Sequence, residues 1–140
     1  MSYLLDTNVL SEIRKGEAAH AAVRAWIAGT AAEDLYVSVL TLGEIRRGIE
    51  RIRLRGDHVQ AHSLDGWLVR LESAYGGRIV PIDARVADLW GRLQVPNPLP
   101  VVDGFLAATA IVHGLILVTR NVSDVRSTPA RILDPFGPPP

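Results

Sequence analysis

Five acidic or amide side chains stand in four separate segments of this sequence, at positions where folding could bring them together: Asp6, Glu44, Asp103 and the pair Asn121 and Asp124. Asp6 directly follows a short apolar run. Carboxylates brought together from separate segments repel one another unless a cation lies between them. The set therefore predicts a site for a hard divalent cation, and magnesium suits both oxygen ligands and phosphate chemistry.

A metal site of this kind would favour hydrolysis. One ion can activate a water molecule, and a second ion about 4 Å away can stabilise the leaving oxygen. This chemistry needs no nucleophilic side chain. The sequence has no cysteine and no recognisable serine elbow, which agrees with metal-assisted hydrolysis and excludes disulfides and thiolate metal sites.

The elements that must position these residues alternate between strands and helices. Apolar runs predict strands at residues 2–5, 35–39, 78–82, 115–118 and 130–133. Helical patterns occupy residues 7–14, 18–28, 41–55, 59–75, 84–93 and 103–113. The alternation predicts an α/β fold, a single domain with a central parallel sheet of four to five strands flanked by helices. Sites in such sheets form beyond the carboxyl ends of the strands, where Asp6 and residues 119–121 would lie.

Each of these residues also has a purely structural interpretation. Asp6 or Asp103 could cap a helix, although Thr7 or Asn8 could equally cap the first one. Residues 119–121 would pass for a turn with Asn121 in a left-handed conformation. His58 and His62 have the spacing of a helical metal pair but no evident third ligand, so a solvated helix face is favoured.

In their order and spacing, these motifs resemble the PIN-domain ribonucleases, in particular the VapC/FitB-like toxins of type II toxin-antitoxin systems. The resemblance rests on residues 4–10, Glu44, residues 102–103 and residues 117–121. It implies a PIN domain over residues 1–136 and a Pro-rich tail over 137–140. It also implies a magnesium-dependent endoribonuclease, with manganese able to substitute, that hydrolyses RNA phosphodiester bonds with a metal-activated water.

The resemblance assigns roles to individual residues. Asp6, Glu44 and Asp103 match the three metal-site acids of the family. Asn121 stands where a fourth acid often occurs, and Asp124 could contribute to the site or brace the loop. Asn8 and Thr119 are expected to shape the site. The implied partners are an RNA substrate, a small antitoxin protein and a second copy in a homodimer.

The densest basic cluster of the chain follows Glu44. On a helix, Arg51 and Arg55 would share the side of Glu44, and Gly48 would leave room for an approaching group. Our hypothesis is that Arg51 or Arg55 holds an RNA backbone near the site. The alternative is a solvated helix face on which Glu50 pairs with arginines.

Composition limits the remaining possibilities. The formal net charge is zero, so any attraction to nucleic acid must be local. The longest apolar stretch, residues 105–118, is interrupted and too short to span a bilayer, and no secretory leader is evident, so we expect a cytoplasmic protein without a membrane segment. Two other functions stay open. One is a catalytically weak PIN-like nucleic-acid-binding module. The other, a magnesium-dependent phosphatase, is disfavoured because Asn8 stands where such an enzyme usually has a carboxylate.

Overall fold

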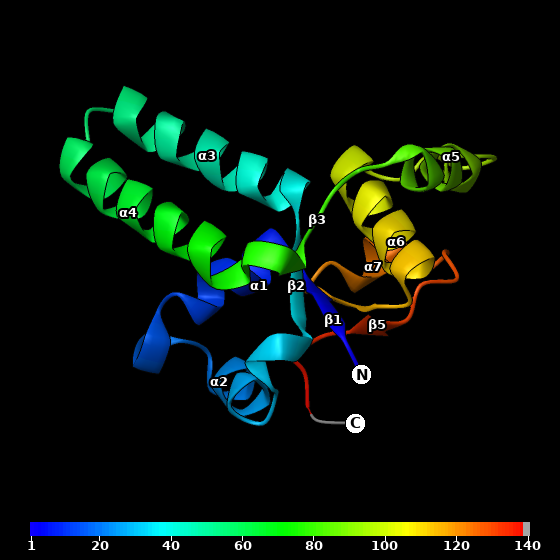
Figure 1. Cartoon of the computed structure of the whole chain (residues 1–140), viewed down its shortest axis with the longest axis horizontal. Coiled ribbons are helices and arrows are strands. Elements are labelled where there is room, and N and C mark those ends of the chain that lie inside the picture. The colour runs from blue at the N-terminus through cyan, green and yellow to red at the C-terminus, as the bar shows by residue number, and fades with distance from the viewer. Residues whose placement is uncertain (139–140) are drawn as a thin grey trace.

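The computed structural model describes residues 1–138 of the chain as one α/β unit (Figure 1). Its strands are β1 (Tyr3–Leu5), β2 (Leu35–Ser38), β3 (Ile79–Val80), β4 (Ile116–Val118) and β5 (Ile132–Leu133). Its α-helices are α1 (Thr7–Ile13), α2 (Ala21–Ala28), α3 (Val39–Leu54), α4 (His58–Tyr75), α5 (Ala84–Leu93), α6 (Val101–His113) and α7 (Val122–Val125). Short 3-10 segments are η1 (Gly16–Ala18), η2 (Ala32–Asp34) and η3 (Gly76–Arg78). Of the expected Pro-rich tail, residues 139 and 140 lie outside the described residues.

The strands form one parallel sheet in the order β3-β2-β1-β4-β5, which confirms the predicted sheet of four to five strands. Strand β1 occupies the centre and pairs with β2 on one side and β4 on the other. Leu4 and Leu5 on this strand are fully buried. The residue that follows β1, Asp6, therefore emerges at the middle of the carboxyl edge of the sheet.

Each face of the sheet has its own hydrophobic core, because successive strand side chains point to opposite faces. Leu5 packs in a core with residues of α1, α3 and α4. Leu4 packs in a second core with residues of α6. Figure 1 shows α3 and α4 running side by side away from the sheet, with α5 and α6 on its other side. Within residues 1–138, none of the helices is both long and apolar enough to cross a bilayer.

Several element boundaries differ from the sequence prediction. The strand expected over 78–82 contains only Ile79 and Val80, because Arg78 belongs to η3 and donates hydrogen bonds to backbone carbonyls of Ala32 and Ala74. The helix expected from residue 18 begins at Ala21, since η1 precedes it and the His20 ring accepts a hydrogen bond from the Ala22 amide. The final strand is likewise shorter than predicted.

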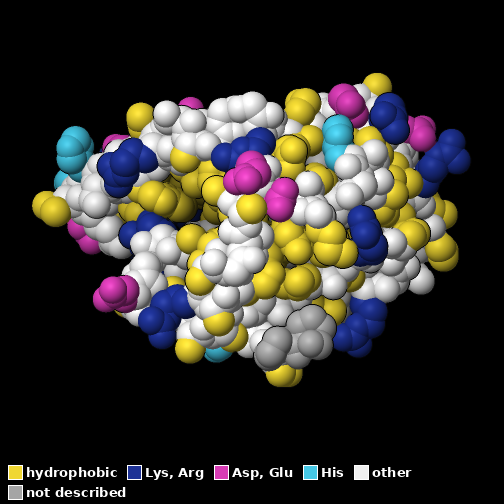
Figure 2. All heavy atoms as spheres, turned by 60° about the horizontal axis from the view of Figure 1, so that its bottom comes forward, with side chains coloured by type: hydrophobic (Ala, Val, Ile, Leu, Met, Phe, Trp, Pro, Cys, Tyr) yellow, Lys and Arg dark blue, Asp and Glu magenta, His cyan; other side chains and the backbone are white. Residues whose placement is uncertain are grey.

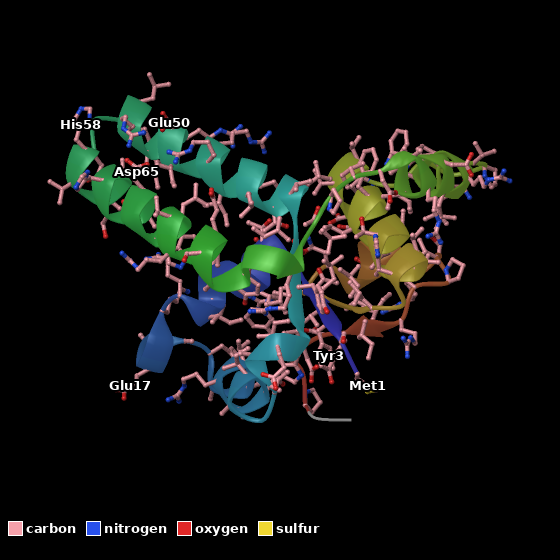
Figure 3. The ribbon with its side chains drawn as sticks, in the orientation of Figure 1. Met1, Tyr3, Glu17, Glu50, His58 and Asp65 are labelled. Atoms are coloured by element: carbon pink, nitrogen blue, oxygen red, sulfur yellow. The ribbon has the colours of Figure 1, made fainter. Side chains whose placement is uncertain are left out.

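Ion pairs join the outer part of the α3–α4 hairpin. Arg46 and Arg53 of α3 both donate to the carboxylate of Asp65 on α4, and both also contact Glu50. Figure 3 shows Glu50 and Asp65 at this outer part of the hairpin. The hydrogen bond from Arg46 holds the pKa of Asp65 below its ordinary value. The expected pairing of Glu50 with arginines is confirmed, and these two arginines are engaged within the hairpin.

Close packing between α5 and α6 fixes the start of α6. The ring of Trp90 stacks on Phe105 at 4.6 Å, and its indole N–H donates to the Val101 carbonyl at 3.2 Å. A Cβ atom on Gly104 would lie 2.7 Å from Nε2 of Gln94 and 3.2 Å from the Trp90 ring. Only glycine allows the two helices to approach this closely without a shift. The neighbouring residue, Asp103, is held in place by this contact.

We expect Gly104→Ala to lower the free energy of unfolding by about 1–3 kcal/mol, because the added methyl group overpacks the α5–α6 contact. The measurement is urea unfolding at equilibrium. Gly91→Ala is the control, since a Cβ atom on Gly91 meets nothing within 4 Å and alanine there should raise stability by about 0.5–1 kcal/mol. Equal stability of the two variants would contradict the close-packing explanation.

Candidate active site

A cavity of about 420 Å³ opens at the carboxyl edge of the sheet, beside the end of β1. Its walls come from the start of α1, the middle of α3, the start of α6 and the loop after β4. The lining residues are Asp6, Thr7, Asn8, Glu44, Arg47, Gly48, Arg51, Pro100, Val101, Val102, Asp103 and Asn121. The fold thus brings most of the acidic and amide residues singled out from the sequence to one cavity.

The carboxylate of Asp6 is buried and fixed at both oxygens. The side chain is only 4% exposed. Its Oδ1 accepts from the Thr7 amide at 2.6 Å, and its Oδ2 accepts from the Thr119 hydroxyl at 2.7 Å. Asp6, and not Thr7 or Asn8, is therefore the N-cap of α1, as one interpretation of the sequence allowed, and it also lines the cavity. The Asp6 side chain therefore both caps α1 and is available to the site.

Glu44 reaches the cavity from the second turn of α3. Its Oε1 accepts a hydrogen bond of 2.6 Å from the hydroxyl of Thr7. The backbone amide of Thr7 bonds Asp6 while its hydroxyl bonds Glu44, so one residue orients two of the acids. The predicted placement of Glu44 at the edge of the buried face is confirmed, since the side chain is half-buried and lines the cavity.

Asp103 lies in the first turn of α6, three positions after the N-cap residue Pro100. It is therefore not the cap, contrary to the structural alternative. Partial burial, the negative charge of Asp6 and the adjacent Asp124 raise the pKa of Asp103 from 3.8 to about 6, whereas a hydrogen bond involving Asn121 opposes the rise. Burial and the neighbouring negative charges both disfavour the ionised form of Asp103.

The loop after β4 contributes through its side chains and its backbone. The Thr119 hydroxyl donates to Asp6 and accepts a hydrogen bond of 3.0 Å from the backbone N–H of Asn121. Asn121 has φ −84° and precedes the short helix α7, so the left-handed conformation of the structural alternative does not occur. Asp124 lies in α7, exposed, and interacts with Asp103. Asn8 lines the cavity from α1 but is exposed.

The arginines of α3 divide between its two sides. Arg47 and Arg51 line the cavity, and neither forms an ion pair with an acid within residues 1–138. Arg55 is the exposed C-cap residue of α3 and does not line the cavity, so of the two arginines named from the sequence only Arg51 reaches it. Sequence reasoning missed Arg47, although its i+3 spacing from Glu44 would have placed both on one helix face.

The donor set fits a hard divalent cation. Asp6, Glu44 and Asp103 offer carboxylate oxygens, and a cation would offset the repulsion that raises the pKa of Asp103. Within residues 1–138, however, no three acidic or histidine side chains are close enough to form a preassembled metal site. Magnesium usually keeps several of its waters, so binding by one or two carboxylates with the rest of its shell hydrated agrees with this spacing.

Similarity to known proteins is extensive. The PIN domain family model matches residues 3–123. The VapC ribonuclease Y4jK of Sinorhizobium fredii is 33% identical over 96% of this chain and 98% of its own length. The toxin FitB of Neisseria gonorrhoeae is 30% identical over 95% of this chain and 97% of its own length.

A solved structure shares the whole architecture. The crystal structure of FitAcB from Neisseria gonorrhoeae superposes with a TM-score of 0.86 at 28% identity. The alignment covers 96% of this chain and 98% of that chain. The similarity therefore includes the sheet, both layers of helices and the edge at which the cavity lies.

The raised pKa of Asp103 gives the metal-free protein a defined pH dependence. Because the folded-state pKa lies near 6, above the ordinary 3.8, the stabilising effect of protonation is fully present below pH 4 and is lost as pH rises through 6. Asp103→Asn cannot ionise and should not show this loss. We compare the free energies of unfolding of Asp103→Asn and the unsubstituted protein in excess chelator. The value for Asp103→Asn minus that for the unsubstituted protein should rise by about 1 kcal/mol from pH 4 to pH 7.5, after allowance for solvent screening.

Chemical unfolding at several pH values with excess chelator measures this difference. Asp88→Asn serves as the control, since Asp88 is an exposed residue of α5 that pairs with Arg92 away from the cavity. A stability difference between Asp103→Asn and the unsubstituted protein that stays constant with pH would contradict the repulsion between Asp103 and its acidic neighbours.

Proposed function

We propose that this chain, which belongs to the PIN-domain family, is a metal-dependent endoribonuclease and the toxin of a toxin-antitoxin pair. The observation that carries the proposal is the meeting of Asp6, Glu44 and Asp103 in one cavity with Arg47 and Arg51. Acidic groups that attract a cation thus adjoin basic groups that attract phosphate. The full-length similarity to proteins named a VapC ribonuclease and a toxin supports the same function.

In this proposal, Asp6, Glu44 and Asp103 would hold magnesium directly or through its water molecules, and manganese could substitute for it. When bound, the ion supplies an activated water and charge stabilisation for hydrolysis of an RNA phosphodiester bond. Thr7 and Thr119 are positioning residues, because their hydrogen bonds orient Asp6 and Glu44.

The remaining polar residues are proposed to bind a proton, water or the substrate. Asp103, whose pKa is raised by burial and by its acidic neighbours, can carry a proton close to neutral pH, and Asn121 and Asn8 offer uncharged polar groups for water or substrate. Arg51 binds the RNA backbone through its planar guanidinium. Local attraction of this kind is required, because the net charge is zero and Lys and Arg are interspersed with acidic side chains on the face seen in Figure 2.

We further propose that a small antitoxin protein restrains this activity in the cytoplasm and that two copies of the chain form a homodimer. An endoribonuclease acting on cellular RNA would harm its host unless a partner blocked it. Two exposed apolar side chains, Val95 after α5 and Val101 at the first position of α6, supply surface that a second copy could cover.

A catalytically weak RNA-binding module is the second candidate. It is favoured by the amide of Asn121 at the position of a possible fourth acid, and by the lack of a preassembled three-acid cluster within residues 1–138. Both features leave less negative charge at the cavity than tight binding of two ions would require.

Cleavage of a mixed set of structured RNAs tests the proposed activity. We expect purified, partner-free protein to cut RNA with magnesium or manganese and to stop when chelator is in excess. Asp6→Asn and Asp103→Asn should each lower the rate at least about 100-fold, because each removes a charged ligand of the ion. Asp88→Asn should cut at the unsubstituted rate, since Asp88 pairs with Arg92 on α5.

Cleavage that persists in chelator would contradict metal dependence. Protein that folds and binds RNA but leaves every RNA intact would favour the binding module. Equal activity of Asp6→Asn and the unsubstituted protein would exclude the assigned cavity as the catalytic site.

The roles of Arg51 and Arg55, the two arginines proposed from the sequence, can be distinguished by substitution. Arg51→Gln should weaken RNA binding and reduce the slope of affinity against salt concentration by about one counterion, because Arg51 lines the cavity. Arg55→Gln should leave both quantities unchanged, because Arg55 lies at the exposed end of α3. Binding titrations at several salt concentrations in chelator measure both effects, and equal losses in the two variants would argue against a local phosphate contact.

A further inference from the structure

A second hollow, of about 260 Å³, adjoins the acidic cavity. The two share Thr7, Glu44 and Gly48 as lining residues. From there the second hollow extends between α1, α3 and α4, away from the sheet. Its other lining residues are Ser11, Arg14, Ile45, Ile49, Ile52, Gln60, Leu64 and Trp67. The cavity and the hollow therefore meet at these three residues, and Gly48 lies between them on α3.

Gly48 has no explanation within the fold itself. It lies in the interior of α3, where glycine costs about 1 kcal/mol relative to alanine. A Cβ atom there would meet nothing within 4 Å, and the backbone does not have a positive φ. Neither close packing nor backbone conformation requires glycine. The absence of a side chain on Gly48 leaves open space between the cavity and the hollow.

The chemistry of the hollow suits a nucleotide. Isoleucines of α3 make an apolar wall, and the guanidinium of Arg14 lies 5.6 Å from the centroid of the Trp67 ring. Gln60 adds an amide that can donate and accept hydrogen bonds. Sites for single-stranded nucleic acid combine aromatic and arginine faces for bases with basic groups for the backbone. Arg47 and Arg51 supply the basic groups at the cavity end of this path.

We propose that the hollow between α1, α3 and α4 is a nucleotide subsite, and that a single RNA strand crosses α3 over Gly48 to reach it from the acidic cavity. This inference rests on the proposed function, because it extends the same site to the nucleotide next to the cleaved bond. Trp67 packs partly on the core and presents its remaining surface to the base. A peptide segment of a protein partner is the competing occupant, which the binding experiments below distinguish.

Binding of labelled single-stranded RNAs of two to ten nucleotides in excess chelator tests the subsite without cleavage. Gly48→Gln places a polar, helix-favouring side chain on the path, and we expect it to lower affinity for the longer RNAs at least tenfold. The dinucleotide, which fills little more than the cavity, should lose much less affinity. Gly91→Gln is the matched control, since Gly91 is also an exposed helical glycine with open space around it. Both variants should unfold at or above the temperature of the unsubstituted protein.

Trp67 fluorescence provides a second readout. In a protein carrying Trp26→Phe and Trp90→Phe, Trp67 is the remaining tryptophan. Longer RNAs should quench its emission by stacking near it, whereas the dinucleotide should not. Unchanged emission on saturation with a ten-nucleotide RNA would overturn the subsite.

The other outcomes are equally distinct. Normal RNA binding by Gly48→Gln, with or without a loss of binding to a protein partner, would assign the hollow to something other than RNA and overturn the inference. Failure of the unsubstituted protein to bind any RNA would overturn both the inference and the proposed function. RNA binding that quenches Trp67 and is weakened by Gly48→Gln, but without cleavage in magnesium, would refute the catalytic proposal and support the subsite.

Discussion

The Asp6 carboxylate, buried at the end of the central strand, is the group on which the arrangement of the site depends. A buried carboxylate is costly unless hydrogen bonds satisfy it. Here the donors come from Thr7 at the start of α1 and from Thr119 after β4. The β1–β4 register, in which Leu5 faces Val118, brings Thr119 to Asp6. Folding of the central strands and assembly of the site are therefore one process.

The same constraint leaves charge that the protein alone does not neutralise. Asp103 reaches the cavity from α6, whose position the contact of Gly104 with Trp90 and Gln94 fixes. Partial burial and the negative charges of Asp6 and Asp124 raise the pKa of its carboxyl group, so Asp103 keeps its proton to a higher pH. Helix α3 balances this acidity on one side with Arg47 and Arg51, while Asp65 and Glu50 engage its other arginines. The hairpin thus presents to the acidic cavity two guanidinium groups that form no ion pair with an acid of the described residues 1–138.

The sequence was sufficient to predict the layers of the fold and most of the cavity, because strand-end position and helical spacing are local properties. Asp6 after an apolar run and Glu44 beside an apolar stripe could be placed in this way. Arg51 also followed from helical spacing, whereas the pairing of Arg46 and Arg53 with Asp65 could not be predicted, because Asp65 belongs to another helix. The double role of Thr7 was also hidden, because its hydroxyl bonds a residue from a different helix. The proposed path over Gly48 could not be predicted either, because the hollow is formed by α4 as well as α3.

Binding of a divalent cation to the RNA-free protein tests the central claim most directly, namely that the acids of this cavity form a cation site. Calorimetric titration with manganese at pH 6, in two buffers of different ionisation enthalpy, measures both affinity and proton release. The site predicts saturable binding that releases part of a proton, because Asp103 is about half protonated at this pH, and Asp103→Asn should abolish the release and weaken binding. Absence of saturable binding, or binding unaltered by Asp103→Asn, would contradict a cation site at these residues.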